Sequence, residues 1–167
     1  ELLTDYMTHI TKSFNIDLDN HSIPTITYRE AMDLYGTDKP DLRVDDFTLK
    51  PTSNSQCKKL TYKLQKEEYE NYLNIFPALQ YKEGDFIGEA KALGELRVKL
   101  MADYNLYRHK WKPLFITDFP MFNVNDLGDY EVTHHPFTLC PDIKPDTDLL
   151  QLTSTQLDLV INGEEVG

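Results

Sequence analysis

The stretch Asp158-Leu159-Val160-Ile161-Asn162-Gly163-Glu164-Glu165-Val166-Gly167 sets an apolar run before Asn-Gly and acidic residues after it. Asn-Gly between strand-like flanks is a strong signal for a β-hairpin, because a type I′ turn needs a positive φ at both central residues. With Asn162 and Gly163 as the two-residue loop, Val160 faces Glu165 across the strand pair. The stretch therefore predicts two antiparallel strands and fixes their register.

That register would bring two carboxylates together. Asp158 lies two residues before Val160 on the same face of its strand, so it also shares a face with Glu165. Diagonal neighbours in a sheet lie roughly 7–8 Å apart at the backbone, which suits one hard cation with its waters and a substrate phosphate. An ordinary acidic hairpin at a solvated sheet edge fits the same spacing, and the spacing alone leaves both interpretations open.

The composition is that of a globular protein with one domain and room for an insertion. The 167 residues are 40% apolar and 11% aromatic. No run approaches the ~20 apolar residues that span a bilayer, so no membrane association is expected. The net charge of −11 disfavours non-specific binding to polyanions, because that affinity comes largely from Lys and Arg. The first residues carry no sign of a targeting peptide.

Two smaller groups of residues have ordinary explanations. Cys57 and Cys140 show no metal-ligand spacing, so we expect free thiols, with a disulfide neither required nor excluded. A basic cluster surrounds Tyr62 and consists of Lys58, Lys59, Lys63 and Lys66. A solvated helix face or loop is favoured there over a nucleic-acid contact.

Helical patterns mark two segments in the first part of the chain. Residues 2–14 carry an apolar stripe that predicts an amphipathic helix packed on a sheet. Thr27 and Glu30 fit a capping box, so a short helix is expected to run to about Leu34 and to end at Gly36.

The middle and last parts of the chain differ in character. Residues 44–82 are polar and less regular, with a helix expected over 64–76, and a longer helix is expected over 84–106. Strands are expected over 114–117, 130–133 and 157–161. Helices beside short strands with hairpin turns predict an α+β fold with an antiparallel sheet.

The segment Tyr-Gly-Thr-Asp-Lys-Pro-Asp-Leu-Arg at 35–43 closely resembles bacterial-type aspartyl-tRNA synthetases. Other segments share this resemblance, in that family's order, at 24–32, 94–100, 118–122, 134–138 and 158–167. The last of them is similar to the family's Leu/Val-Ile-Asn-Gly-x-Glu-x-Gly strand pair. Together these segments span most of the chain, which makes the resemblance specific.

The resemblance implies part of a class II synthetase core, an antiparallel sheet into which a small α/β module is inserted. It divides the chain into a first core part at 1–43, a shortened or incomplete insertion module at 44–112 and a second core part at 113–167. The implied activity is aspartate–tRNA ligation, in which ATP and aspartate form aspartyl-adenylate before transfer to the tRNA 3′ end. The alternative is a non-catalytic, synthetase-like binding or regulatory paralogue.

Site residues also follow from the resemblance. His134 is implied to line the aspartate pocket, and His135 is a second candidate for that pocket. Asp158 and Glu165 match the acidic pair that holds Mg²⁺ against the ATP phosphates, so Glu165 is also implied to bind ATP. The physical reason is that Mg²⁺ prefers a few carboxylates plus phosphate oxygens and offsets the charge that develops on pyrophosphate. No residue is assigned as a catalytic group.

Lys39 lies between Asp38 and Asp41, and we expect ion pairing to fix a turn there. The resembled family carries substrate-binding arginines in two conserved segments, motifs 2 and 3, that have no counterpart in this chain. This polypeptide alone is therefore expected to be inactive. The parent enzyme is expected to be a homodimer that binds tRNA, in the cytoplasm or in the matrix of a mitochondrion or other organelle.

Overall fold

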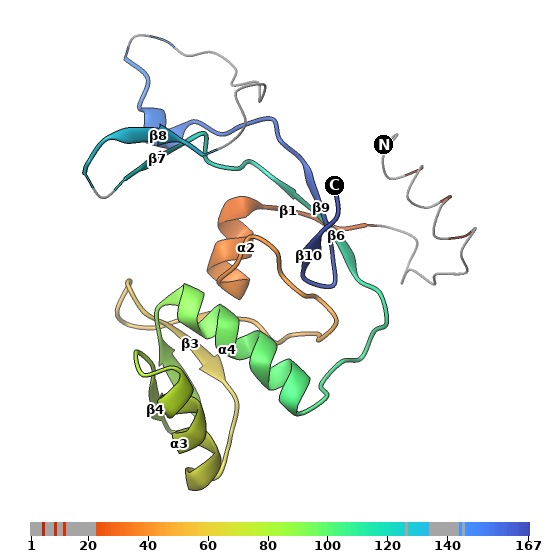
Figure 1. Ribbon diagram of the computed structural model, residues 1–167, viewed down its shortest axis with the longest axis vertical. Coiled ribbons are helices and arrows are strands. Elements are labelled where there is room, and N and C mark those ends of the chain that lie inside the picture. Colours follow the sequence, from red (N-terminus) through yellow and green to blue (C-terminus); the bar gives the residue numbers. More distant parts are fainter. Residues whose placement is uncertain are drawn as a thin grey trace.

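The computed structural model describes residues 5, 9, 12, 23–125, 127–133, 144 and 146–167 (Figure 1). The first sheet contains β1 (Thr25–Thr27), β6 (Pro113–Thr117), β9 (Asp158–Ile161) and β10 (Glu164–Glu165). The second sheet contains β2 (Lys50–Pro51), β3 (Lys58–Thr61), β4 (Gln80–Lys82) and β5 (Asp85–Gly88). The remaining elements are α2 (Tyr28–Tyr35), α3 (Lys66–Ile75), α4 (Ala90–Asp103), β7 (Phe122–Val124), β8 (Tyr130–Val132) and the 3₁₀ turn η2 (Leu149–Gln151). Helices beside mainly antiparallel strands confirm the predicted α+β class.

The first sheet has the order β1-β6-β9-β10, with β6 hydrogen-bonded on both sides. Leu114 and Ile116 of β6 are fully buried in one apolar cluster, while Phe115 points to the other face and packs in a second cluster. A strand that is covered on both faces has a continuous apolar sequence, as this strand has. β1 pairs with β6 in parallel, so the sheet is mixed and not wholly antiparallel as predicted.

Helix α2 begins and ends where the sequence predicts. The Thr27 hydroxyl accepts a hydrogen bond from the Glu30 amide at 3.1 Å, and the Glu30 carboxylate accepts one from the Thr27 amide at 2.8 Å. Gly36 ends the helix with a φ of 70°, and its amide donates to the Met32 carbonyl at 3.0 Å. The capping box and the glycine stop are thus confirmed, and Ala31 seats the helix on the first sheet.

The second sheet corrects two expectations. All its strands are antiparallel in the order β2-β3-β5-β4, so the segment at 44–82 is more regular than predicted. The helix expected over 84–106 begins only at Ala90, because Asp85–Gly88 forms β5 between β3 and β4. Hydrogen bonds to two partner strands stabilise β5, and such partners are invisible to local periodicity. Lys58 and Lys59 of the basic cluster therefore lie on a strand, not on a helix or loop.

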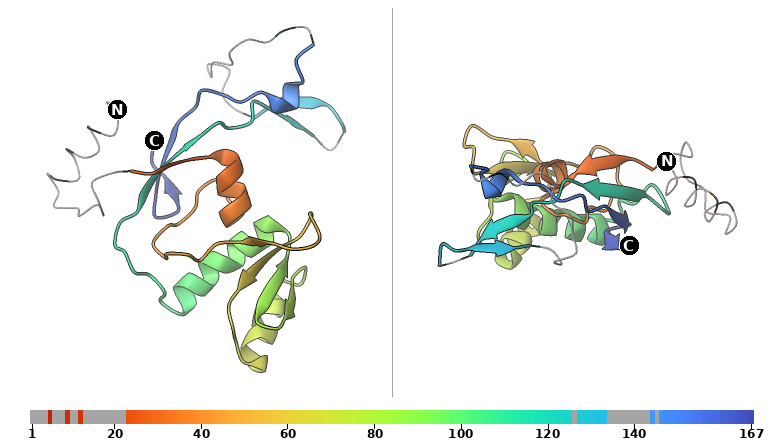
Figure 2. Two further views of the ribbon diagram at one scale, coloured as in Figure 1. Left: turned by 180° about the vertical axis from the view of Figure 1, so that it is seen from behind. Right: turned by 90° about the horizontal axis from the view of Figure 1, so that it is seen from above.

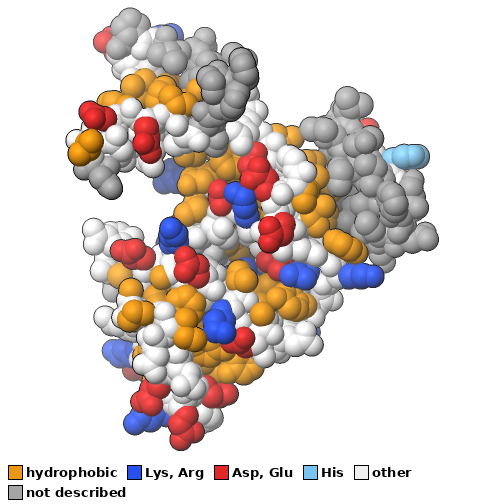
Figure 3. All heavy atoms as spheres, viewed as in Figure 1, with side chains coloured by type: hydrophobic (Ala, Val, Ile, Leu, Met, Phe, Trp, Pro, Cys, Tyr) orange, Lys and Arg blue, Asp and Glu red, His pale blue; other side chains and the backbone are white. Residues whose placement is uncertain are grey.

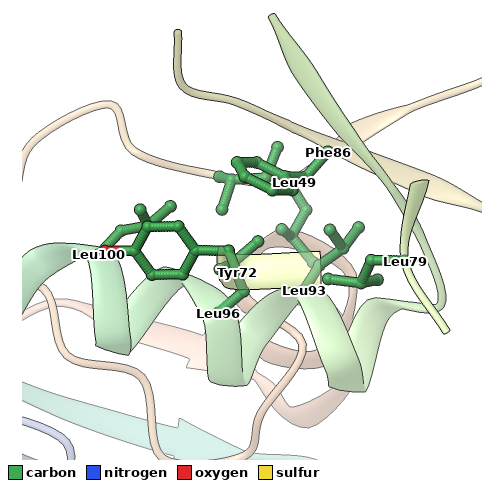
Figure 4. Packing of buried hydrophobic residues seen from close by; sticks show 8 residues of the cluster. Leu49, Tyr72, Leu79, Phe86, Leu93, Leu96 and Leu100 are labelled. Carbon is green, nitrogen blue, oxygen red and sulfur yellow. The ribbon is translucent and has the colours of Figure 1, made fainter. Parts of the chain in front are cut away.

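Helices α3 and α4 cover the second sheet and form its core. Leu93, Leu96 and Leu100 of α4 are completely buried against the rings of Tyr72 and Phe86 (Figure 4). The expected helix at 64–76 is confirmed as Lys66–Ile75. The sheet and both helices come from residues 50–103, inside the predicted 44–112 module, whose boundaries remain a prediction.

Helix α4 also joins the two sheets, since it contacts both α2 and β3 and lies between α2 and the second sheet in the left view of Figure 2. Two glycines permit this contact. A Cβ on Gly36 would lie 1.9 Å from the Ala90 carbonyl oxygen, and a Cβ on Gly94 would lie 2.5 Å from the Tyr35 carbonyl oxygen. Backbone thus meets backbone at this α2–α4 junction, which leads directly into the loop after Gly36.

The β7–β8 hairpin extends away from both sheets (Figure 1). Its second strand confirms the strand expected near 130–133. None of the helices that the structure describes combines the length and the apolar character needed to cross a membrane.

Candidate functional site

The C-terminal hairpin has the predicted turn and register. Asn162 and Gly163 have φ values of 54° and 90°, the signs that a type I′ turn requires. Glu165 pairs with Val160 in the antiparallel ladder. Asp158 lies two residues before Val160 and therefore shares a face of the hairpin with Glu165. The hairpin prediction is confirmed, and the two carboxylates belong to one face.

The two carboxylates differ in their surroundings. Asp158 is only 7% exposed, and its Oδ1 accepts a hydrogen bond from Gln156 Nε2 at 2.7 Å. The Glu165 side chain is 43% exposed, and its Oε2 lies 3.0 Å from Lys39 Nζ. Asp158 is therefore held by the sheet, while Glu165 reaches solvent and contacts a loop from the first part of the chain.

The turn of the hairpin is held from two sides. Asn162 Nδ2 donates to the Lys110 carbonyl at 3.0 Å, and the Lys112 amide donates to Asn162 Oδ1 at 2.9 Å. On the other side, a Cβ on Gly163 would lie 3.3 Å from Asp41 Cβ. The position of Glu165 thus depends on packing that involves three separate segments.

The loop at 37–43 brings Lys39 to Glu165. Lys39 Nζ also lies 3.3 Å from Asp38 Oδ2, so the ammonium contacts two carboxylates. Hydrogen bonding to Glu165 is the largest cause of a raised Lys39 pKa. The expected ion pairing of Lys39 is correct for Asp38, but Asp41 instead pairs with Arg43, whose Nε donates at 3.0 Å. That pairing is also the main cause of a raised Arg43 pKa.

Arg97 of α4 anchors this loop, and sequence reasoning gave it no role. Its side chain is 1% exposed, with Nη2 donating to the Asp41 carbonyl at 2.8 Å and Nε donating to the Phe47 carbonyl. Burial lowers the Arg97 pKa, yet guanidinium remains charged in proteins. Nη1 has no hydrogen-bond partner among the described residues. The sequence did contain a sign that Arg97 is buried, because position 97 lies on the same helical face as the apolar Leu93, which is itself buried.

A cleft of about 780 Å³ borders the hairpin turn and the loop. Its lining includes Tyr28, Lys39, Tyr107 and Glu164. Burial is the main cause of a raised Tyr28 pKa, with a further contribution from Asp38.

Glu164 and Glu165 are neighbours on β10 and so point to opposite faces. Acidic and basic side chains are interspersed over the face of the molecule that Figure 3 presents.

The described residues of this region could supply two carboxylates, Asp158 and Glu165, to a hard cation, and no third His, Cys, Asp or Glu ligand. Two carboxylates on one face are oxygen donors of the kind that Mg²⁺ accepts together with phosphate oxygens and water. Within the parts of the chain that the structure describes, no group of three or more His, Cys, Asp and Glu side chains could hold a metal by itself. A cation here would need further ligands from water or substrate, and the metal assignment of Asp158 and Glu165 remains a prediction.

Several predicted features lie outside the described residues. These include His134 and His135 of the expected aspartate pocket, Cys140, and the expected helix at 2–14 apart from three single positions.

Comparisons with known proteins agree with the resemblance. The family model for class II tRNA synthetases (D, K and N) matches residues 1–167. An aspartate–tRNA(Asp/Asn) ligase of Ruthia magnifica subsp. Calyptogena magnifica is 31% identical over 222 residues, covering 92% of this chain and 37% of the relative. An aspartate–tRNA ligase of Buchnera aphidicola subsp. Baizongia pistaciae (strain Bp) is 46% identical over 79 residues, covering 45% of this chain and 14% of the relative. The chain therefore spans well under half the length of these curated relatives.

Proposed function

The chain belongs to the class II tRNA synthetases of the D, K and N group, and from this premise we propose that it is part of an aspartate–tRNA ligase. The parent enzyme would activate aspartate with ATP to aspartyl-adenylate and transfer the aspartyl group to the tRNA 3′ end. The choice of aspartate is supported by the names of both relatives, aspartate–tRNA(Asp/Asn) ligase and aspartate–tRNA ligase.

One observation carries the assignment of the ATP site. The register of the hairpin gives Asp158 and Glu165 a common face, with Glu165 exposed to solvent. Mg²⁺ bound there would neutralise charge on the ATP phosphates. The role of the protein would be to hold both carboxylates in place, Asp158 through the sheet and Glu165 through the clamped turn. His134 and His135 are proposed to contact the aspartate substrate.

The test is aspartate-dependent exchange of pyrophosphate into ATP by the intact protein, meaning the parent enzyme of which this chain is proposed to be a part. Asparagine and lysine are tested in place of aspartate as alternative substrates. Glu165→Gln keeps the shape and hydrogen-bonding reach of the side chain but removes its charge. By analogy with the loss of one donor to a transition-state charge, exchange is expected to fall about 10²–10³-fold. Stability is expected to change by no more than about 0.5 kcal/mol, as for other exposed positions.

Glu67→Gln is the matched control, because it removes the same charge from an exposed position on α3 that does not line the cleft. Exchange by this variant is expected to stay close to the wild-type rate. Equal losses in both variants, or no loss with Glu165→Gln at any Mg²⁺ concentration, would contradict the proposed metal site. Absence of exchange with all three amino acids in the intact protein would instead favour the non-catalytic paralogue.

A further inference from the structure

Lys39 contacts Glu165, one of the two proposed cation ligands. Its Nζ lies 3.0 Å from Glu165 Oε2 and 3.3 Å from Asp38 Oδ2. The side chains of Lys39, Asp38 and Glu165 are 38%, 40% and 43% exposed. All three groups can therefore exchange partners with solvent and ions without disturbing a packed interior.

The backbones that carry these groups are fixed much more firmly than the groups themselves. Asp41 is 4% exposed, its carbonyl accepts a hydrogen bond from the buried Arg97, and its Cβ packs on Gly163 of the turn. Asn162 ties the same turn to the segment at 110–112. Lys39 on its anchored loop and Glu165 on the anchored hairpin thus face each other, so their contact is a consequence of the fold.

We propose that Lys39 and a divalent cation compete for Glu165, with Lys39 serving as the counter-ion of Glu165 until the cation binds. The proposal rests on the proposed metal site at Asp158 and Glu165. When the cation takes the Glu165 oxygens, Lys39 keeps its contact with Asp38, the second carboxylate within its reach. Lys39 is in this sense a residue that sets the affinity of the site for its cation.

Charge and flexibility both support this exchange. An ammonium next to a divalent cation is repelled by it, so the two cannot share one carboxylate at no cost in affinity. Lysine is a point charge on a flexible stem and can turn to another acceptor. Exposed ion pairs are weak, so a cation can displace this one.

The experiment is a Mn²⁺ titration of the intact protein in the absence of substrates, followed through the electron paramagnetic resonance signal of free Mn²⁺. Lys39→Met is expected to tighten Mn²⁺ binding about two- to fivefold, the range that corresponds to loss of one exposed ion pair. Lys39→Arg keeps the charge and is expected to bind with wild-type affinity. In a Glu165→Gln background, Lys39→Met is expected to have no effect.

Lys110→Met is the matched control. Lys110 is exposed, its carbonyl is bonded to the same turn, and its loss changes the net charge equally. An equal gain in affinity with Lys110→Met would show a general charge effect and overturn the proposal, as would unchanged or weaker binding in Lys39→Met. If Glu165→Gln alone leaves Mn²⁺ binding unchanged, the proposed metal site fails as well. If Glu165→Gln weakens binding but Lys39→Met does not strengthen it, only the competition is refuted.

Discussion

Replacing Gly36 with alanine should push the two sheets apart, because the added methyl group enters the α2–α4 junction where backbone meets backbone. Gly36 has a φ of 70°, a left-handed conformation that costs an L-residue with a Cβ about 1–2 kcal/mol. The new Cβ would also lie 1.9 Å from the Ala90 carbonyl oxygen, so α4 has to move away from α2. Overpacking of this kind costs about 1–3 kcal/mol. The expected loss for Gly36→Ala is therefore about 2–5 kcal/mol, from a total that is typically about 5–15 kcal/mol.

Two further substitutions divide this loss into its causes. Gly128 also has a positive φ, 85°, but its Cβ would meet nothing within 4 Å, so Gly128→Ala should lose only the strain of about 1–2 kcal/mol. Gly94 lies inside α4, and replacing a helical glycine with alanine normally stabilises a helix by about 1 kcal/mol. Gly94→Ala should nevertheless destabilise, because its Cβ would lie 2.5 Å from the Tyr35 carbonyl oxygen.

Urea unfolding followed by the fluorescence of Trp111 measures all three variants, and ΔG comes from linear extrapolation. Equal losses for Gly36→Ala and Gly128→Ala, or a gain for Gly94→Ala, would refute the close approach of α2 and α4. The α2–α4 junction would then be too loose to position the loop that carries Lys39.

Two other substitutions test local contacts. Thr27→Ala removes the hydroxyl that accepts from the Glu30 amide and should destabilise by about 1 kcal/mol in the same urea assay; an unchanged midpoint would contradict the capping box. The pKa of Asp85 is lowered mainly by its hydrogen bonds to Lys59 and Thr61. A lowered folded-state pKa stabilises above the unfolded value of about 3.9, and this stability is lost as the pH falls through the folded value. Asp85→Asn should therefore be less stable at pH 7 and lose less on acidification to pH 3, and parallel curves for both proteins would contradict this.

The parts of the fold that the sequence predicts correctly rest on requirements within a few residues. Asn162-Gly163 supplies the two positive φ values of the turn, and the register of the hairpin follows from them by counting. Thr27 and Glu30 satisfy the free amides at the start of α2 with their own side chains. Neither prediction depends on where the rest of the chain lies.

The features that local patterns do not predict depend on distant partners. Residues 85–88 become a strand because β3 and β4 lie on either side of them, and no local period shows that. Arg97 is buried because carbonyls of a remote loop meet its guanidinium, which no count along α4 reveals. A charge at position 97 on the apolar face of α4 could have been marked as unusual, but its partners could not have been named.

The same distinction explains why the sequence predicted the position of Glu165 on the hairpin but not its contact with Lys39. Its face follows from the hairpin, whereas its contact with Lys39 requires that α4 hold the loop at 37–43 against the turn. Arg97 belongs to the helix that covers the second sheet, and it contacts no carboxylate of the candidate site. A disturbance of that helix would nevertheless reach Glu165 through Asp41 and Gly163. The geometry of the hairpin site is therefore set partly by the packing of α4, although no residue of that helix supplies a proposed ligand.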